Sequence, residues 1–172
     1  MIDKLPRYII LFVLLLVAQI LVFNHIYVSG YLSVYPYILF LLLLPSDINR
    51  SLLLVLAFVL GISVDLFSDS MGIHAAACVP VAYMRSLILR TSTSLESKND
   101  SFEPNVHYFG GWRRYVLYAG VLILVHHSIL LFLEAFSFNH FFSTLLKIMG
   151  SSILSFIFIV LIQYIFFKRE EK

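Results

Sequence analysis

The residue with the clearest chemical potential is an aspartate within an apolar stretch. Asp65 lies near the end of the run from residue 51 to residue 67, and Asp69 follows it by one helical turn. An aspartate at the centre of a membrane helix costs on the order of 3 kcal/mol, so Asp65 is a functional candidate. It could lock neighbouring helices together or hold a cation. Alternatively, it lies hydrated at the membrane surface or accepts hydrogen bonds from the free N–H groups of the next helix, and the spacing favours this interpretation.

Histidines form the second group of candidates. His126 and His127 are adjacent in the middle of an apolar run, and Glu134 follows His127 by seven residues on the same helical face. His74, His127 and Glu134 could line a polar pocket. With His25, His74 and His140, which the topology places near the outer surface, the central histidines could form a proton path or a metal site. No two histidines have the i, i+4 spacing of a helical zinc site. The pattern therefore favours neutral, hydrogen-bonded imidazoles, and we expect no metal and no cofactor.

Motifs of catalysis are absent from the sequence. It contains no glycine-rich phosphate loop, no nucleophile elbow and no HExxH pattern. Cys78 is the only cysteine, so no disulfide can form within the chain. We expect a protein that is not an enzyme and has no catalytic residues.

The composition identifies the solvent in which these residues must be positioned. The chain has 172 residues, of which 60% are hydrophobic and 13% charged, and its mean hydropathy is +0.93. A soluble domain is about half apolar and roughly a quarter charged. The apolar residues fall into successive runs separated by short polar segments, a pattern typical of a polytopic membrane protein. The net charge of only +2, without a basic patch, argues against nucleic-acid binding.

The runs predict an all-α fold: one membrane domain, residues 1–172, with six transmembrane helices paired as three hairpins. The expected spans are residues 8–23, 31–44, 51–67, 72–89, 115–133 and 148–167, and the longest loop is 91–114. The second span is the least regular, because it contains Pro36 and is short for a hydrocarbon core of roughly 30 Å.

The basic residues predict the orientation of these spans. Lys and Arg are retained on the cytoplasmic side, and with the N-terminus inside, 11 of the 12 fall on that side. These are Lys4, Arg7, Arg50, Arg85, Arg90, Lys98, Arg113, Arg114, Lys168, Arg169 and Lys172. Only Lys147 falls outside, so we expect both termini and the loop 91–114 on the cytoplasmic side.

Small and amphipathic residues suggest packing and anchoring roles. Gly61, Gly72 and the run Ala75, Ala76 and Ala77 would allow two helices, or a helix and a partner, to approach closely. Arg85 and Arg90 lie near the inner end of the fourth span and could extend to lipid phosphates, while Trp112 is typical of an interfacial aromatic belt. We interpret these three residues as lipid-interface anchors.

The segment 61–77, GISVDLFSDSMGIHAAA, resembles the signature of the rod shape-determining protein MreD family. That signature has a glycine, an apolar residue, two variable positions and an aspartate, followed seven residues later by a glycine that leads into a small-residue helix. Gly61, Asp65 and Gly72 occupy the motif positions. The segments 41–45, 49–50 and 82–85 resemble the version found in Bacteroidetes-type bacteria. The similarity in residues covers about Pro45 to Arg85, and the loop 91–114 is longer than the family pattern.

The resemblance implies a non-enzymatic component of the bacterial inner membrane that acts in cell elongation. MreD-like proteins bind the single-span periplasmic scaffold MreC. They act with the actin-like MreB, the glycosyltransferase RodA and a class B penicillin-binding transpeptidase in peptidoglycan synthesis. The family fold is similar to the substrate-binding subunits of energy-coupling-factor vitamin transporters. That similarity leaves a second hypothesis, a substrate-binding subunit of a small-molecule transporter. Its outward-facing polar pocket could be lined by Asp65, His74, Glu134 and His140.

Overall fold

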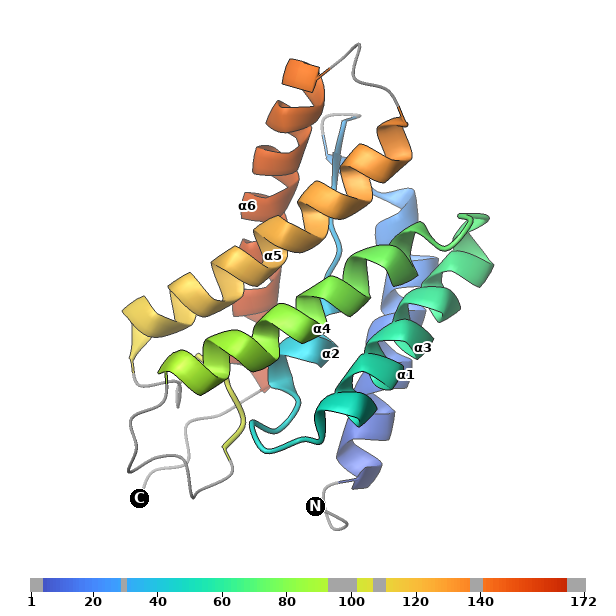
Figure 1. Cartoon of the computed structure of the whole chain (residues 1–172). Coiled ribbons are helices and arrows are strands. Elements are labelled where there is room, and N and C mark those ends of the chain that lie inside the picture. The colour runs from blue at the N-terminus through green and yellow to red at the C-terminus, as the bar shows by residue number, and fades with distance from the viewer. Residues whose placement is uncertain (1–4, 29–30, 93–101, 107–110, 137–140, 167–172) are drawn as a thin grey trace.

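A computed structural model describes residues 5–28, 31–92, 102–106, 111–136 and 141–166 (Figure 1). The elements in chain order are α1 (Leu5–Leu21), the 3-10 turn η2 (Phe23–His25), β1 (Tyr27–Val28), β2 (Leu32–Ser33), α2 (Ile38–Leu43), α3 (Arg50–Ser68), α4 (Ile73–Ser92), α5 (Trp112–Ala135) and α6 (Phe141–Phe166). The strands pair antiparallel as a short hairpin. Apart from this hairpin, the prediction of a helical protein is confirmed.

Four helical segments are long and apolar enough to cross a membrane, namely Leu5–His25, Arg50–Ser68, Trp112–Ala135 and Phe141–Phe166. Their outward faces carry large apolar side chains such as Leu66 and Ile165, which are 73% and 72% exposed. Lipid is the solvent that matches such surfaces. The helices therefore indicate a membrane protein, as predicted. α4 has 20 residues, but it is rich in small residues and contains Pro80 and Arg85.

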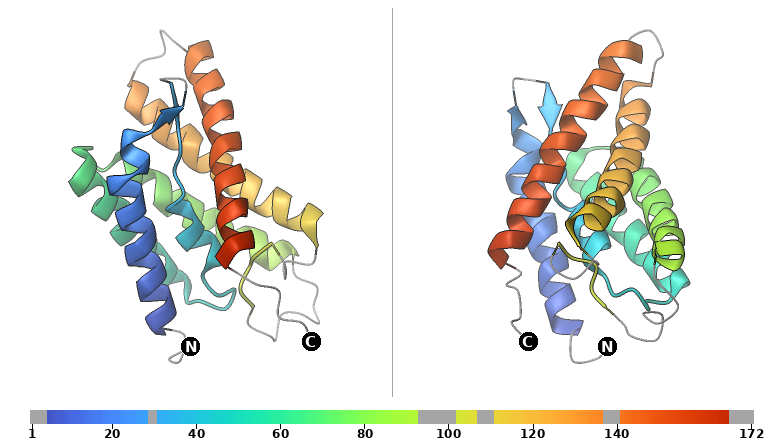
Figure 2. Two further views of the ribbon diagram at one scale, coloured as in Figure 1. Left: turned by 180° about the vertical axis from the view of Figure 1, so that it is seen from behind. Right: turned by 90° about the vertical axis from the view of Figure 1, so that its left-hand side faces the viewer.

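The long helices surround a central part of the chain. α3 packs against α4, α4 against α5 and α5 against α6, while α1 lies beside α3 and β2 contacts α6 (Figures 1 and 2). The start of α1 and the end of α6 lie at one end of the bundle, which we call the terminal end. The β1–β2 hairpin and the α3–α4 turn lie at the other end, the hairpin end (Figure 1).

The central segment, residues 34–44, differs from the prediction. A spanning helix over residues 31–44 was expected, and this expectation is wrong: β2 and a turn occupy residues 32–37, and α2 has only six residues. α2 starts just after Pro36, whose carbonyl accepts from the Leu39 N–H. Every residue of α2 is at most 2% exposed. Because the surrounding helices shield this segment from lipid, its backbone does not have to form a continuous helix.

Polar side chains of the surrounding helices satisfy the non-helical backbone around this segment. Gln19 Nε2 donates to Val34 O (3.3 Å), Ser33 N and Tyr35 N donate to the hydroxyls of Ser151 (3.2 Å) and Ser155 (3.0 Å), and Tyr118 OH donates to Leu42 O (3.0 Å). A buried backbone group without a partner would cost several kcal/mol in a membrane. These polar residues in α1, α5 and α6 are therefore part of the structural core.

The other helices form near their predicted positions. The largest shift is at α6, which begins at Phe141 and not near residue 148. In the loop predicted over residues 91–114, residues 93–101 and 107–110 lie outside the described part of the chain. Residues 102–106 are held at the terminal end: Phe102 N donates to Ser46 Oγ (3.1 Å) and Val106 N donates to Gln163 Oε1 (2.9 Å).

Candidate functional site

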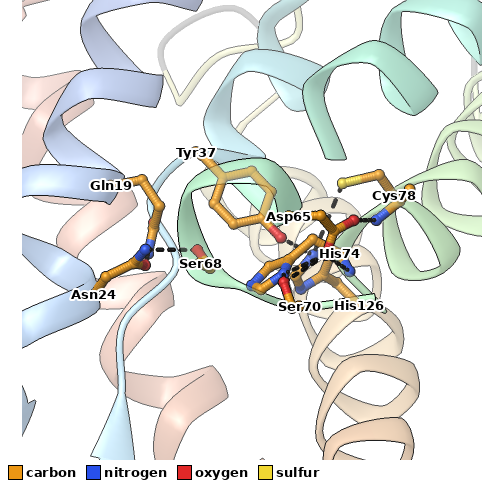
Figure 3. Close-up of polar contacts among 10 residues, drawn as sticks. Gln19, Asn24, Tyr37, Asp65, Ser68, Ser70, His74, Cys78 and His126 are labelled. Carbon is orange, nitrogen blue, oxygen red and sulfur yellow. Dashed lines mark hydrogen bonds and ion pairs between the residues drawn. The ribbon is translucent and has the colours of Figure 1, made fainter. Parts of the chain in front are cut away.

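Asp65 binds the N-terminus of α4. Its Oδ1 accepts from the backbone N–H of His74 (3.0 Å), and its Oδ2 accepts from that of Ala75 (2.9 Å). The Ser70 hydroxyl donates to Oδ1 as well (2.6 Å) (Figure 3). Asp65 is only 3% exposed. Of the sequence interpretations, the one in which the carboxylate caps the next helix is therefore the arrangement in the structure.

The local sequence explains why the cap comes from α3. Gly72, which directly precedes α4, has no side chain to cap the helix, and its φ of +81° is a conformation that favours glycine. The carboxylate of Asp65 takes the place of the usual N-cap side chain. It also lies at the positive end of the α4 dipole, where a negative charge is stabilised. α3 ends at Ser68, and the backbone N–H of the C-cap residue, Asp69, donates to Asp65 O.

Close packing joins the same two helices. A Cβ on Gly61 would lie 2.4 Å from the Cα of Ala75, a distance that atoms do not tolerate. Only glycine at this position allows α3 and α4 to approach this closely. Ala75 and Ala77 are buried, at 5% and 0% exposed. Ala76 is exposed on the other side of α4, so the run of three alanines does not form one packing face.

His74 extends the cap toward the surface. Its Nδ1 lies 3.0 Å from Asp65 Oδ1 and 3.0 Å from Ser70 Oγ. The Ser70 hydroxyl already donates to the carboxylate, so a proton on Nδ1 is the arrangement without repulsion between acceptors. Nε2 of a neutral His74 is then an acceptor.

His126 and His127 lie deeper in the bundle. His127 Nδ1 donates to Ile123 O (2.9 Å), so its Nε2 accepts from the Ser155 hydroxyl (2.9 Å). His126 Nε2 pairs with the Tyr37 hydroxyl (2.7 Å). Both imidazoles are fully buried. The prediction that His74, His127 and Glu134 line one pocket is therefore wrong for His127, which belongs to the core that supports the central segment.

A cleft of about 940 Å³ opens at the hairpin end. His74 and Glu134 line it, but His127 does not. The described residues that line it are Phe23, Asn24, His25, Ser33, Tyr35, Phe67, Ser68, Asp69, Ser70, Met71, Gly72, Ile73, His74, Ala76, Leu130, Leu133, Glu134 and Phe136. Glu134 also pairs with Lys147 (3.4 Å). The volume is within the range of small-molecule sites in proteins.

The position of Arg85 differs from the prediction. It was expected to reach lipid phosphates, but it is 1% exposed and lies inside the terminal end of the bundle. Its guanidinium donates to the carbonyls of Leu44 and Pro45, at the C-terminal end of α2. The non-helical end of α2 leaves these carbonyls free, and a cation complements them. Arg90 and Trp112 are exposed on the bundle surface, where lipid-interface anchors would lie.

The cleft is the part of this arrangement that can bind a ligand. Within the described residues, no group of three His, Cys, Asp or Glu side chains could hold a metal ion. Cys78 Sγ lies 4.0 Å from His126 Nε2, but both side chains are 0% exposed. A substrate at the surface would not reach this thiol. The cleft, in contrast, presents polar and apolar groups to the exterior.

Sequence reasoning missed the residues that hold the central segment. The signal for them was present, since Ser151 and Ser155 are spaced i, i+4 in an apolar helix and Gln19 and Gln163 interrupt apolar runs. Such residues would be unfavourable facing lipid, so they must face protein. What they bind could not be deduced, because the sequence did not reveal that the second span is partly non-helical.

Comparison of the chain with protein-family models, with curated proteins and with solved structures finds no match in any of the three. An assignment of function therefore depends on the segment 61–77 and on the geometry around it.

Proposed function

We propose that this chain is an MreD-like component of the bacterial cell-elongation machinery in the inner membrane. In this proposal it has six crossings, with the terminal end in the cytoplasm and the hairpin end in the periplasm. The distribution of basic residues along the sequence supports this orientation, because with six crossings 11 of the 12 would lie on the cytoplasmic side. The only exception, Lys147, is paired with Glu134 near the hairpin end.

The observation that carries the proposal is that all three motif residues act at one joint. Gly61 permits the contact of α3 with Ala75, Asp65 caps α4, and Gly72 supplies the turn between them. A motif whose residues serve a rigid helix–helix joint fits a protein that acts by presenting surfaces. We infer that it binds an MreC-like periplasmic scaffold and helps to position RodA and the transpeptidase, without catalysing a reaction itself.

Depletion with complementation tests this role. In a rod-shaped host that depends on this protein, depletion should produce round cells, and the wild-type chain should restore rods. Asp65→Ala should fail to restore rods or to co-purify an MreC-like partner. Asp47→Ala changes an exposed carboxylate in the loop before α3. This control should restore rods and co-purify the partner. Cells that keep their shape on depletion, with no such partner recovered, would contradict the proposal.

A second candidate function is the substrate-binding subunit of a small-molecule transporter. The observation that favours it is the open cleft at the hairpin end, which no described Phe or Leu side chain fills. Thermal-shift measurements on the purified protein with a panel of vitamins separate the two candidates. A vitamin that raises the unfolding temperature would support the transporter, and a uniformly negative panel would leave the elongation role as the better account.

A further inference from the structure

We propose that the cleft at the hairpin end binds an organic cation with hydrogen-bond donors and an apolar body, such as a primary ammonium attached to an aromatic or aliphatic group. The inference does not depend on the cell-elongation role. Such a ligand could be the cargo of a transporter subunit or an effector of an interaction protein.

The charge of the lining is the first argument. Asp69 and Glu134 line the cleft, and none of the described lining residues is a Lys or Arg. Lys147 pairs with Glu134 from one side, so Asp69 is the carboxylate that stays available. Its side chain is exposed at the end of α3, and no hydrogen bond to it is formed by the residues that the structure describes. A cation would be attracted to this position.

The distribution of donors and acceptors is the second argument. Several donors in the lining are directed at acceptors of the protein itself: the Ser70 hydroxyl and His74 Nδ1 to Asp65, and the Asn24 amide to Ser68 Oγ (2.7 Å) (Figure 3). The cap on α4 therefore leaves Nε2 of His74 as an acceptor at the lining. A cleft that offers acceptors is complementary to a ligand that brings donors.

The apolar part of the lining is the third argument. Phe23, Tyr35, Phe67 and Phe136 line the cleft beside the polar residues, together with Leu130, Leu133 and Met71. Aromatic faces attract ammonium groups and also pack against apolar carbon. The combination of a carboxylate, an imidazole acceptor and aromatic rings selects for a cation with an apolar body over an inorganic ion.

The test uses the full chain in lipid nanodiscs and three probes of similar shape. Phenethylammonium has the charge and the donors, benzyltrimethylammonium has the charge without donors, and 2-phenylethanol has no charge. Binding is followed by thermal shift and by ligand-detected NMR. We expect phenethylammonium to bind most tightly, benzyltrimethylammonium more weakly and 2-phenylethanol least.

Variants connect the binding to the cleft. Asp69→Asn should weaken phenethylammonium binding about tenfold or more, because it removes a charge-assisted hydrogen bond. Asp47→Asn, at an exposed carboxylate between α2 and α3, is the matched control and should not change it. His74→Asn keeps a donor near Asp65 but removes the Nε2 acceptor, so it should reduce the preference for phenethylammonium over benzyltrimethylammonium.

Three results would overturn the proposal. The first is a protein that binds no probe at millimolar concentrations while it is folded by its thermal transition. The second is equal binding of 2-phenylethanol and phenethylammonium, since the site would then be merely apolar. The third is an affinity that Asp69→Asn leaves unchanged relative to Asp47→Asn.

Discussion

The hairpin end and the terminal end of the bundle each contain a buried charge, but they are built differently. At the hairpin end, Asp65 caps α4 beside an open cleft. At the terminal end, Arg85 binds the carbonyls that follow α2, and residues 102–106 lie across the bundle with Asn105 and Val106 only 4% and 6% exposed. In the part of the chain that the structure describes, the hairpin end thus has an open cleft, whereas residues 102–106 cover the terminal end.

The two ends show how a membrane bundle can bury single charged side chains. Asp65 is at the N-terminus of a helix and Arg85 is near the C-terminus of another, so each charge has the sign that complements the helix end. Burying a charge without such partners would cost several kcal/mol. Backbone groups therefore stabilise both charges, and neither position requires a counter-ion from another helix.

Cysteine labelling tests the comparison most directly and has the largest expected effect. Cys78 is fully buried, so the wild-type chain should not react with a maleimide in the folded state. Met71→Cys, at a fully exposed position on the cleft, should react fast. Val106→Cys should react at least about tenfold more slowly than Met71→Cys, because local structure protects position 106. The measurement is the rate of labelling in permeabilised vesicles, and equal rates would show that the terminal end is as open as the hairpin end.

The packing of α3 on α4 should give the largest effect on stability. Gly61→Ala places a Cβ 2.4 Å from the backbone of Ala75, so the helices must separate. We expect a loss of about 3 kcal/mol in the free energy of unfolding, measured by denaturation in detergent micelles. Gly120→Ala is the control, since its Cβ would meet no atom within 4 Å. It should be neutral or slightly stabilising, and equal losses in the two variants would contradict the role of Gly61.

Removal of the cap should have a smaller effect. Asp65→Ala leaves the N–H groups of His74 and Ala75 without their acceptor, which should cost about 2 kcal/mol. Asp65→Asn keeps one acceptor oxygen, so its free energy of unfolding should decrease less than that of Asp65→Ala. The free energy of unfolding of both variants is compared with that of Asp47→Ala. If Asp65→Ala is as stable as this control, the carboxylate is not the cap that positions α4.

The sequence predicted the helices better than the central segment, and the reason is physical. Apolar runs and basic gaps report where a chain meets lipid, so α3 and α5 form close to the predicted positions. The segment 34–44 meets only protein, and an apolar composition does not distinguish a buried turn from a buried helix. Arg85 was misplaced for the same reason. A cation near the end of a span is usually at the lipid surface, and only the free carbonyls of Leu44 and Pro45 explain its burial.

The candidate site was predictable where it depends on local spacing and not where it depends on tertiary contacts. The short distance in sequence between Asp65 and the first residues of α4 indicated a helix cap. In contrast, Glu134 reaches the cleft from α5, and His127 turns toward Ser155 of α6. These two residues lie seven positions apart on one predicted face. Which of them meets the cleft depends on where the neighbouring helices pack, and no pattern in the sequence gives that information.

The smallest expected effect concerns the cover over the terminal end. Gln163 Oε1 accepts from Val106 N, and its amide donates to the Tyr115 hydroxyl, so one side chain joins α6, α5 and residues 102–106. Gln163→Leu removes both bonds and should cost about 1 kcal/mol, because hydrogen bonds within membrane proteins contribute little individually. The loss should be local: hydrogen exchange at Val106 should accelerate, while exchange in α3 and α4 stays unchanged. Thr144→Val, at a buried polar side chain of α6 near the hairpin end, is the control that should leave Val106 protected. Faster exchange across the whole bundle in Gln163→Leu would mean that the two ends are one cooperative unit, and the contrast between an open and a covered end would then be one of shape and not of stability.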